Sequence, residues 1–203
     1  MPGQLFIISG PSGGGKSTII RALKERIGPL GYSISHTSRK PREHEKDGRD
    51  YFFVTRKHFL DMIEREAFVE WAEVYHDFYG TSYESIHKQS AAGLDVLLDL
   101  DSQGARNIKT HFENCTLIYV LPPSLDILEN RLRRRRSDEE GAIRERMGKA
   151  AAEVYNCLWY DYVVINDELE KAVQDVTSII VAERCRAPRQ IPRIKTWGGI
   201  ALA

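Results

Sequence analysis

The sequence has no long hydrophobic run, little cysteine and no net charge. Its 203 residues include 29 lysines and arginines and 29 aspartates and glutamates, so no global field favours nucleic acid or an anionic membrane. No apolar run approaches a membrane span, and the first residues do not form a signal peptide. The 3 cysteines lack C-x-x-C spacing, which argues against disulfides and zinc. We therefore expect a cytoplasmic protein that binds neither nucleic acid nor membrane.

The length suits one α/β domain with inserted lobes. Apolar runs alternate with segments of helical period, which predicts a parallel sheet covered by helices on both faces. The predicted strands are residues 5–9, 32–37, 96–99, 117–121 and 162–165. Shorter strands at 51–54 and 68–73, around a helix at 57–66, indicate a small mixed lobe inserted into this core.

The last third of the chain is mainly helical. Two charged helices, at 124–134 and 138–155, meet at an arginine-rich turn, and a closing helix is predicted at 169–186. The final segment, residues 187–203, contains two prolines and two glycines without a clear period. We expect an irregular tail there.

The most informative segment is a glycine-rich loop directly after the first predicted strand. Residues 10–17 read G-P-S-G-G-G-K-S and fit the pattern G-x-x-x-x-G-K-[ST]. Glycines let successive N–H groups turn inward around phosphate oxygens, and the predicted helix that follows points its N-terminus at the same phosphates. Lys16 would reach the β- and γ-phosphates, and the Ser17 hydroxyl would ligate Mg²⁺. A glycine-rich turn without a ligand is the alternative.

A pair of arginines, Arg39 and Arg42, follows the second predicted strand, where open α/β sheets bind ligands. Guanidinium forks suit a phosphate monoester better than lysines, because each offers two parallel N–H bonds. Tyr51 would donate its hydroxyl to the same phosphate. A solvated charge cluster and an ordinary, partly buried tyrosine are the alternatives.

An acid, Glu70, interrupts an otherwise apolar predicted strand. One carboxylate accepts both N1–H and N2–H₂ of guanine, whereas adenine presents an acceptor at N1. An edge-strand glutamate facing water is the alternative. Tyr79 and Thr81 follow within reach of phosphate and base, although capping of the next helix by Thr81 or Ser82 needs no substrate.

Two further acids, Asp99 and Asp101, end the predicted strand at 96–99. Asp99 would hold Mg²⁺ through water, and Asp101 would reach the base or the metal shell; turn formation by aspartate is the alternative. The arginine-rich turn fits a mobile cover over phosphates better than a nucleic-acid patch, because acids are interspersed. Asn166 follows the last predicted strand, where it would contact an adenine ring or cap a helix.

Together these motifs resemble the guanylate kinase family. The resemblance covers about residues 5–184 and includes S-R-K-P-R, D-G-R-D-Y-F, F-V-E-W-A, Y-G-T-S and L-D-L-D-S-Q-G. It implies an α/β fold with a P-loop parallel β-sheet core flanked by helices, an inserted mixed α/β NMP-binding lobe and a helical lid. The implied guanylate kinase-like domain is 1–186, with core 1–34, 83–123 and 156–186, NMP-binding lobe 35–82 and lid 124–155; the irregular C-terminal tail is 187–203.

The resemblance also implies the binding residues. On the GMP side these are Ser35, Arg39, Arg42, Tyr51, Glu70, Tyr79, Thr81 and Asp101. On the ATP side they are Gly10, Pro11, Ser12, Gly13, Gly14, Gly15, Lys16, Ser17, Thr18 and Asn166, with Mg²⁺ as the cofactor at Ser17 and Asp99. The implied catalytic set is Lys16, Arg39, Arg42, Arg131, Arg135 and Arg146. The family usually has Arg-Gly where this chain has Arg135-Arg136, and Ser38 replaces a common threonine.

The implied activity converts ATP and GMP, and also dGMP, to ADP and the nucleoside diphosphate in purine metabolism. In-line transfer with Mg²⁺ and arginines needs no general base, because the GMP phosphate, with a second pKa of about 6, is already largely dianionic. The expected partners are the small molecules ATP and GMP, and the expected state is a monomer or homodimer. One alternative is a kinase for another small phosphate, such as a ribose bisphosphate, which would not need Glu70 and Asp101. The other is a scaffold module that binds phosphopeptides; such modules usually have degraded phosphate loops.

Overall fold

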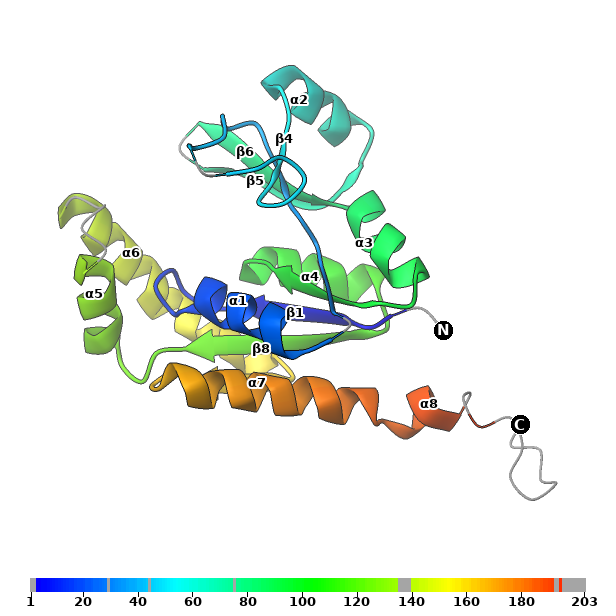
Figure 1. Cartoon of the computed structure of the whole chain (residues 1–203). Helices are drawn as coiled ribbons and strands as arrows, with labels where there is room; N and C mark the ends of the chain where they lie inside the picture. The colour runs from blue at the N-terminus through cyan, green and yellow to red at the C-terminus, as the bar shows by residue number, and fades with distance from the viewer. Residues whose placement is uncertain are drawn as a thin grey trace.

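The computed structural model describes residues 3–28, 30–43, 45–74, 76–134, 140–191 and 194. Figure 1 shows a layered core of sheet and helices, a smaller lobe above it and a pair of helices projecting at one side. The predicted fold class is confirmed: a parallel sheet lies between helices, and a second, mixed sheet is inserted into the chain.

The core of the described chain is a five-stranded parallel sheet in the order β2-β7-β1-β8-β9. Its strands are β1 (Leu5–Ser9), β2 (Leu30–Tyr32), β7 (Asp95–Asp99), β8 (Cys115–Leu121) and β9 (Tyr162–Ile165). All five residues of β1 are buried, as expected for a central strand covered on both faces. In the register, Ile8 pairs with Asp99 and Ser9 with Tyr119, so the C-terminal ends of three strands share one edge.

Helices cover both faces because successive strand residues point to opposite sides. Phe6 and Ile8 pack against α1 (Lys16–Arg26) and α7 (Leu169–Arg184). Leu5 and Ile7 pack on the other face against α3 (Tyr83–Ala91) and α4 (Ser102–His111). The central strand therefore contributes to two hydrophobic cores.

The inserted lobe has a four-stranded sheet in the order β4-β3-β6-β5 and one helix. These elements are β3 (His36–Thr37), β4 (Phe52–Phe53), α2 (Arg56–Glu64), β5 (Phe68–Val74) and β6 (Asp77–Ser82). Phe59, Phe68 and Phe78 form a separate small core. The lobe thus has a small core of its own, while Val69 of β5 packs into a core of the parallel sheet.

The single strand predicted at 32–37 is wrong, because the chain changes sheets within it. β2 ends in the core sheet, and β3 begins in the lobe. The hydrogen bonds show where the change occurs: Ser33 N donates to Leu97 O, while Ser35 O accepts from Phe52 N. The polar residues between the two strands therefore connect core and lobe.

The projecting pair consists of α5 (Leu125–Arg134) and α6 (Glu140–Glu153), followed by the 3-10 helix η1 (Val154–Trp159). The helix predicted at 138–155 thus ends earlier, at Glu153, where η1 follows. Residues 135–139 lie outside the described part. Leu128, Leu132, Ile143 and Ala150 form the small core that joins the pair.

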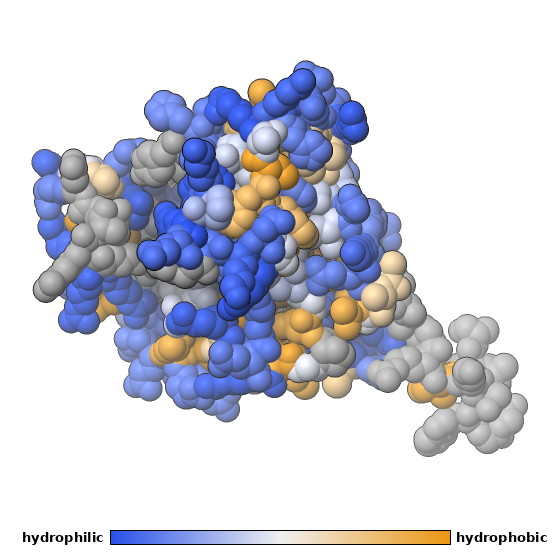
Figure 2. Space-filling model, turned by 45° about the horizontal axis from the view of Figure 1, so that its top comes forward, coloured by the Kyte–Doolittle hydropathy of each residue, from blue (hydrophilic) through white to orange (hydrophobic). Residues whose placement is uncertain are grey.

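One face of the molecule is mainly polar (Figure 2). Figure 2 shows a mostly hydrophilic face on which hydrophobic residues gather in small patches. None of the helices in the described part of the chain has the length and hydropathy needed to cross a bilayer.

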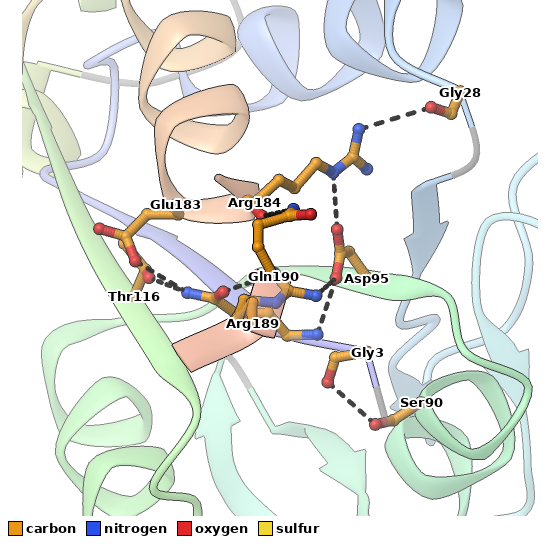
Figure 3. Close-up of polar contacts among 10 residues, drawn as sticks. Gly3, Gly28, Ser90, Asp95, Thr116, Glu183, Arg184, Arg189 and Gln190 are labelled. Carbon is orange, nitrogen blue, oxygen red and sulfur yellow. Dashed lines mark hydrogen bonds and ion pairs between the residues drawn. The ribbon is translucent and has the colours of Figure 1, made fainter. Parts of the chain in front are cut away.

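The expectation of an irregular tail is wrong for its first four residues, which form α8 (Ala187–Gln190). A proline near the helix start is favourable there, since its missing N–H is not needed. Arg189 donates to Gln4 Oε1 at 2.6 Å and to Asp95 Oδ1 at 2.8 Å, and Arg184 donates to Asp95 Oδ2 at 2.7 Å. Figure 3 shows both guanidinium groups directed at the Asp95 carboxylate.

This carboxylate lies at the N-terminal end of β7, with only 7% of its side chain exposed. Burial by itself would raise the pKa of Asp95, but hydrogen bonds from the Gln4 N–H, Arg189 and Arg184 outweigh it and lower that pKa below the usual 3.8. The charged form is therefore stabilised in the fold, where it joins β1, β7, α7 and α8.

We expect Asp95→Asn to lower the free energy of unfolding by about 2–3 kcal/mol at neutral pH, because two arginines lose a buried partner. Urea unfolding measures this loss. The difference should shrink as the pH falls through the lowered pKa of Asp95, since the wild-type carboxyl is then neutral as well. Glu170→Gln, in the exposed pair with Arg26, is the control and should change little. Equal effects of the two substitutions would contradict the structural role of Asp95.

Candidate active site

The glycine-rich loop joins β1 to α1 at the C-terminal edge of the sheet. Gly10, Pro11, Ser12, Gly13, Gly14 and Gly15 form the loop, and Lys16, Ser17 and Thr18 form the first turn of α1. Gly15 has φ 98°, and a Cβ there would lie 2.1 Å from Asn166 Nδ2, so only glycine fits. Glycine has no side chain that could cap the helix, so the first N–H groups of α1 are available to bind an anion.

Asn166 supports the loop from behind. It follows β9, is 5% exposed, and donates from Nδ2 to Gly14 O at 2.8 Å. Its own carbonyl accepts from Arg131 Nη2 at 2.8 Å, which ties α5 to the same place. Gly13, Gly15 and Arg131 line an adjacent cavity of about 350 Å³ together with Thr18, Arg134, Asn166, Asp167 and Leu169. This cavity therefore lies directly beside the glycine-rich loop.

The loop lysine is folded onto its own loop: Lys16 Nζ donates to Gly10 O at 2.7 Å and to Pro11 O at 3.3 Å. On the other side of α1, Ser17 and Asp99 line a cleft of about 450 Å³ that also includes Tyr51 of the lobe. Burial raises the pKa of Asp99, and the positive charge of Lys16 partly offsets that rise. One cleft therefore lies between α1, which follows the glycine-rich loop, and the inserted lobe.

The predicted GMP-side residues lie mainly on the lobe. Ser35 precedes β3, Arg39 and Arg42 follow it, Tyr51 precedes β4, Glu70 lies in β5, Tyr79 and Thr81 lie in β6, and Asp101 precedes α4. Ser35 Oγ lies 3.3 Å from Thr81 Oγ1, and the Arg39 guanidinium lies 5.6 Å from the Tyr51 ring centroid. The structure thus brings together residues that are more than forty positions apart in the chain.

An acid that the sequence reasoning missed holds Arg39 in place. Arg39 Nη2 donates to Glu45 Oε1 at 2.8 Å and to Oε2 at 2.9 Å, and the Arg42 N–H donates to Oε2 at 2.8 Å. The two side chains of the pair are each 16% exposed. The signal was an acid three residues after Arg42 in the same loop. The Arg42 residue itself is exposed.

The base-reading candidate, Glu70, is a half-buried carboxylate. It pairs with Thr81 in the β5–β6 register. The pKa of Glu70 is raised to about 7. Burial is the largest cause; hydrogen bonds from Thr81 act in the opposite direction, and the nearby charge of Asp101 contributes to the rise. Asp101 caps α4 by accepting from the Gly104 N–H at 2.8 Å. The two acids are thus close enough for the charge of one to raise the pKa of the other.

Two of the three predicted lid arginines lie in the described part of the chain, one on α5 and one on α6. Arg131 contacts the end of β9 through Asn166 O and Asp167 O, and Arg146 lies half-buried on α6. Arg135 lies outside the described residues. Arg134, which the sequence reasoning did not select, lines the cavity beside Gly13 and Gly15.

Comparison with known proteins agrees with this geometry. The family model for guanylate kinase matches residues 3–183. The guanylate kinase of Carboxydothermus hydrogenoformans is 43% identical over 198 residues, covering 98% of this chain and 97% of the relative. That of Nitrosospira multiformis is 47% identical over 192 residues, covering 95% and 91%. The chain belongs to the guanylate kinase family.

Its fold also matches a solved member of that family. The crystal structure of guanylate kinase from Anaplasma phagocytophilum has a TM-score of 0.77 and 30% identity, and covers 98% of this chain and 97% of the other. The chain is an enzyme, a guanylate kinase that phosphorylates GMP with ATP, a reaction that generally needs a divalent metal. High identity to relatives that are guanylate kinases favours this activity over both a ribose bisphosphate kinase and a phosphopeptide-binding scaffold module.

In this guanylate kinase, the raised pKa of Glu70 makes folding stability depend on pH. Between the usual pKa of 4.5 and the folded value of about 7, the folded chain holds this proton and the unfolded chain releases it. Stability therefore falls as the pH rises through that window, because burial of the charged form becomes costly.

We expect Glu70→Gln to remove this cost in the nucleotide-free protein. Relative to the wild type, the variant should gain about 3 kcal/mol of unfolding free energy between about pH 4.5 and pH 8, at about 1.4 kcal/mol per pKa unit. Urea unfolding of both proteins at the two pH values measures the gain. A constant difference between them would show that Glu70 titrates normally.

Proposed function

We propose that the two nucleotides bind on either side of the cleft between α1 and the lobe, and that the γ-phosphoryl group of ATP passes directly to GMP. The observation that carries this proposal is the cleft itself, which Ser17 and Asp99 line from the core and Tyr51 lines from the lobe. In-line transfer requires that the γ-phosphate of ATP and the phosphate of GMP lie end to end, and that positive charges surround them.

On the acceptor side, Arg39, Arg42, Tyr51 and Tyr79 bind the GMP phosphate, and Ser35 lies beside them. The proposal is supported by the pairing of Arg39 with Glu45, which presents the guanidinium in one orientation. The guanine edge is read by Glu70, Thr81 and Asp101, since two acceptors in a half-buried place select a base that carries adjacent donors.

On the donor side, residues 10–18 bind the ATP phosphates, and the adenine extends toward the cavity beside Asn166. Lys16 leaves its loop carbonyls to reach the β- and γ-phosphates. Arg131, Arg135 and Arg146 approach from the lid to neutralise charge as the phosphoryl group moves. We assign the core to 1–34, 83–123 and 156–186, the NMP-binding lobe to 35–82 and the lid to 124–155.

We propose Mg²⁺ as the metal, held by Ser17 and, through water, by Asp99. Among the described residues no group of three or more histidines, cysteines or acids is placed to hold a metal ion. This small donor set fits Mg²⁺, which usually takes one or two protein ligands and completes its shell with phosphates and water. When bound, it neutralises charge on the β- and γ-phosphates. We further propose that dGMP is accepted, that the enzyme is cytoplasmic, and that it is a monomer or homodimer.

The role of Lys16 is tested by Lys16→Ala. We expect kcat to fall by about 100-fold or more, because a charge that stabilises the transition state is removed. The variant should fold normally by circular dichroism. Lys171→Ala, an exposed lysine on α7, is the matched control and should retain full activity. Near-normal turnover of a folded Lys16→Ala enzyme would remove Lys16 from the mechanism.

Base selection is tested with GMP, dGMP, AMP, CMP and UMP in a coupled assay of ADP release. We expect GMP and dGMP to be preferred, and Glu70→Gln to raise KM for GMP by about 10- to 100-fold, since an amide leaves one guanine donor unpaired. KM for ATP should stay unchanged. Equal use of AMP and GMP by the wild type would end the assignment of the guanine pocket.

A further inference from the structure

A core helix meets the strand of Glu70 at a glycine. Gly104 is buried in the first turn of α4, and a Cβ placed there would lie 2.8 Å from Glu70 Cγ, 3.3 Å from Leu100 Cβ and 3.4 Å from Glu70 Cβ. Packed carbon atoms normally stay about 3.5–4.0 Å apart. The stem of the Glu70 side chain therefore occupies the space that any other residue at position 104 would fill.

A second contact fixes the same strand one turn farther along α4. Asn107 Nδ2 donates to Val69 O at 3.2 Å. Residues 104 and 107 share a helix face, because they are three positions apart. α4 of the core thus holds β5 of the lobe at two consecutive residues, Val69 by its carbonyl and Glu70 by the side-chain stem.

Gly104 also contacts Asp101, the second acid of the proposed guanine site. Its N–H donates to Asp101 Oδ1 at 2.8 Å, and the charge of Asp101 is close enough to raise the pKa of Glu70. Gly104 therefore touches both acids, one through its N–H group and the other through the space where it lacks a side chain.

We propose that Gly104 is a specificity-determining residue of this guanylate kinase: its missing side chain lets the Glu70 carboxylate stand beside Asp101, where both face the guanine edge. The inference rests on the proposed role of Glu70 in reading guanine. A methyl group at position 104 pushes on the middle of the Glu70 side chain, not on its free end, so the carboxylate has to move as well.

The test is Gly104→Ala. We expect KM for GMP to rise by about tenfold, which corresponds to about 1.4 kcal/mol of lost binding. The preference for GMP over AMP, expressed as the ratio of the two kcat/KM values, should fall by a similar factor. Turnover at saturating GMP and KM for ATP should change by less than about twofold, because the phosphate contacts are untouched.

Gly28→Ala is the matched control, since a Cβ at Gly28 meets no atom within 4 Å. It should leave KM for GMP unchanged. A general effect of losing a glycine, such as reduced freedom of the unfolded chain, would appear in both variants.

A double-mutant cycle separates this inference from the proposed function. Glu70→Ala removes the Cγ atom that alanine at 104 would meet, so in that background Gly104→Ala should change KM for GMP by less than about twofold. If Glu70→Ala alone leaves KM for GMP unchanged, the proposed role of Glu70 is wrong. If Glu70→Ala raises it but Gly104→Ala does not, or Gly104→Ala has the same effect in both backgrounds, the inference about Gly104 is wrong.

Folding of the variants gives a second readout. If Gly104→Ala does not fold, the double variant should fold, because the collision with Glu70 is gone. Failure of both to fold would place the constraint at Leu100 and overturn the inference.

Discussion

Parallel pairing of β1 with β7 and β8 is the constraint on which the active site depends. Since parallel strands end at the same edge, the loop after β1 and the acid at the end of β7 are brought together there. β9 continues the sheet, and the residue after it, Asn166, holds the glycine-rich loop from behind. The phosphate-binding loop is thus supported by a strand that lies more than a hundred and fifty residues away in the chain.

Charged residues at the opposite edge of the same sheet stabilise the fold. Gln4 and Asp95 lie at the N-terminal ends of their strands, where α7 and α8 close the domain through Arg184 and Arg189. The arginines and the aspartate form ion pairs, which offset the free-energy cost of burying their charges. Glu70 lies instead in β5 of the lobe, where burial and the nearby charge of Asp101 raise its pKa to about 7. In the proposed site a base that carries adjacent donors satisfies both acids, so selectivity comes at a cost to the stability of the free protein.

The lobe is packed as a separate unit and connected to the core by few elements. Its own phenylalanine cluster stabilises it, and the chain passes between the two sheets at residues 33–35. α4 is a firm contact between lobe and core, because Asn107 and Gly104 meet β5 directly. A helix of the core therefore contacts the lobe that carries most of the residues proposed to bind GMP.

The sequence alone determined the glycine-rich loop and the main strands, because periodicity and motif spacing are local properties. It did not determine the division of 32–37 between two sheets, the pairing of Glu45 with Arg39, or the docking of α8 on Asp95. It also gave no reason for glycine at 104. These features depend on contacts that residues make only in the folded chain. The local sequence pattern does not show which residues become partners in a hydrogen bond or a packing contact. Only the tertiary structure decided them, through burial and register.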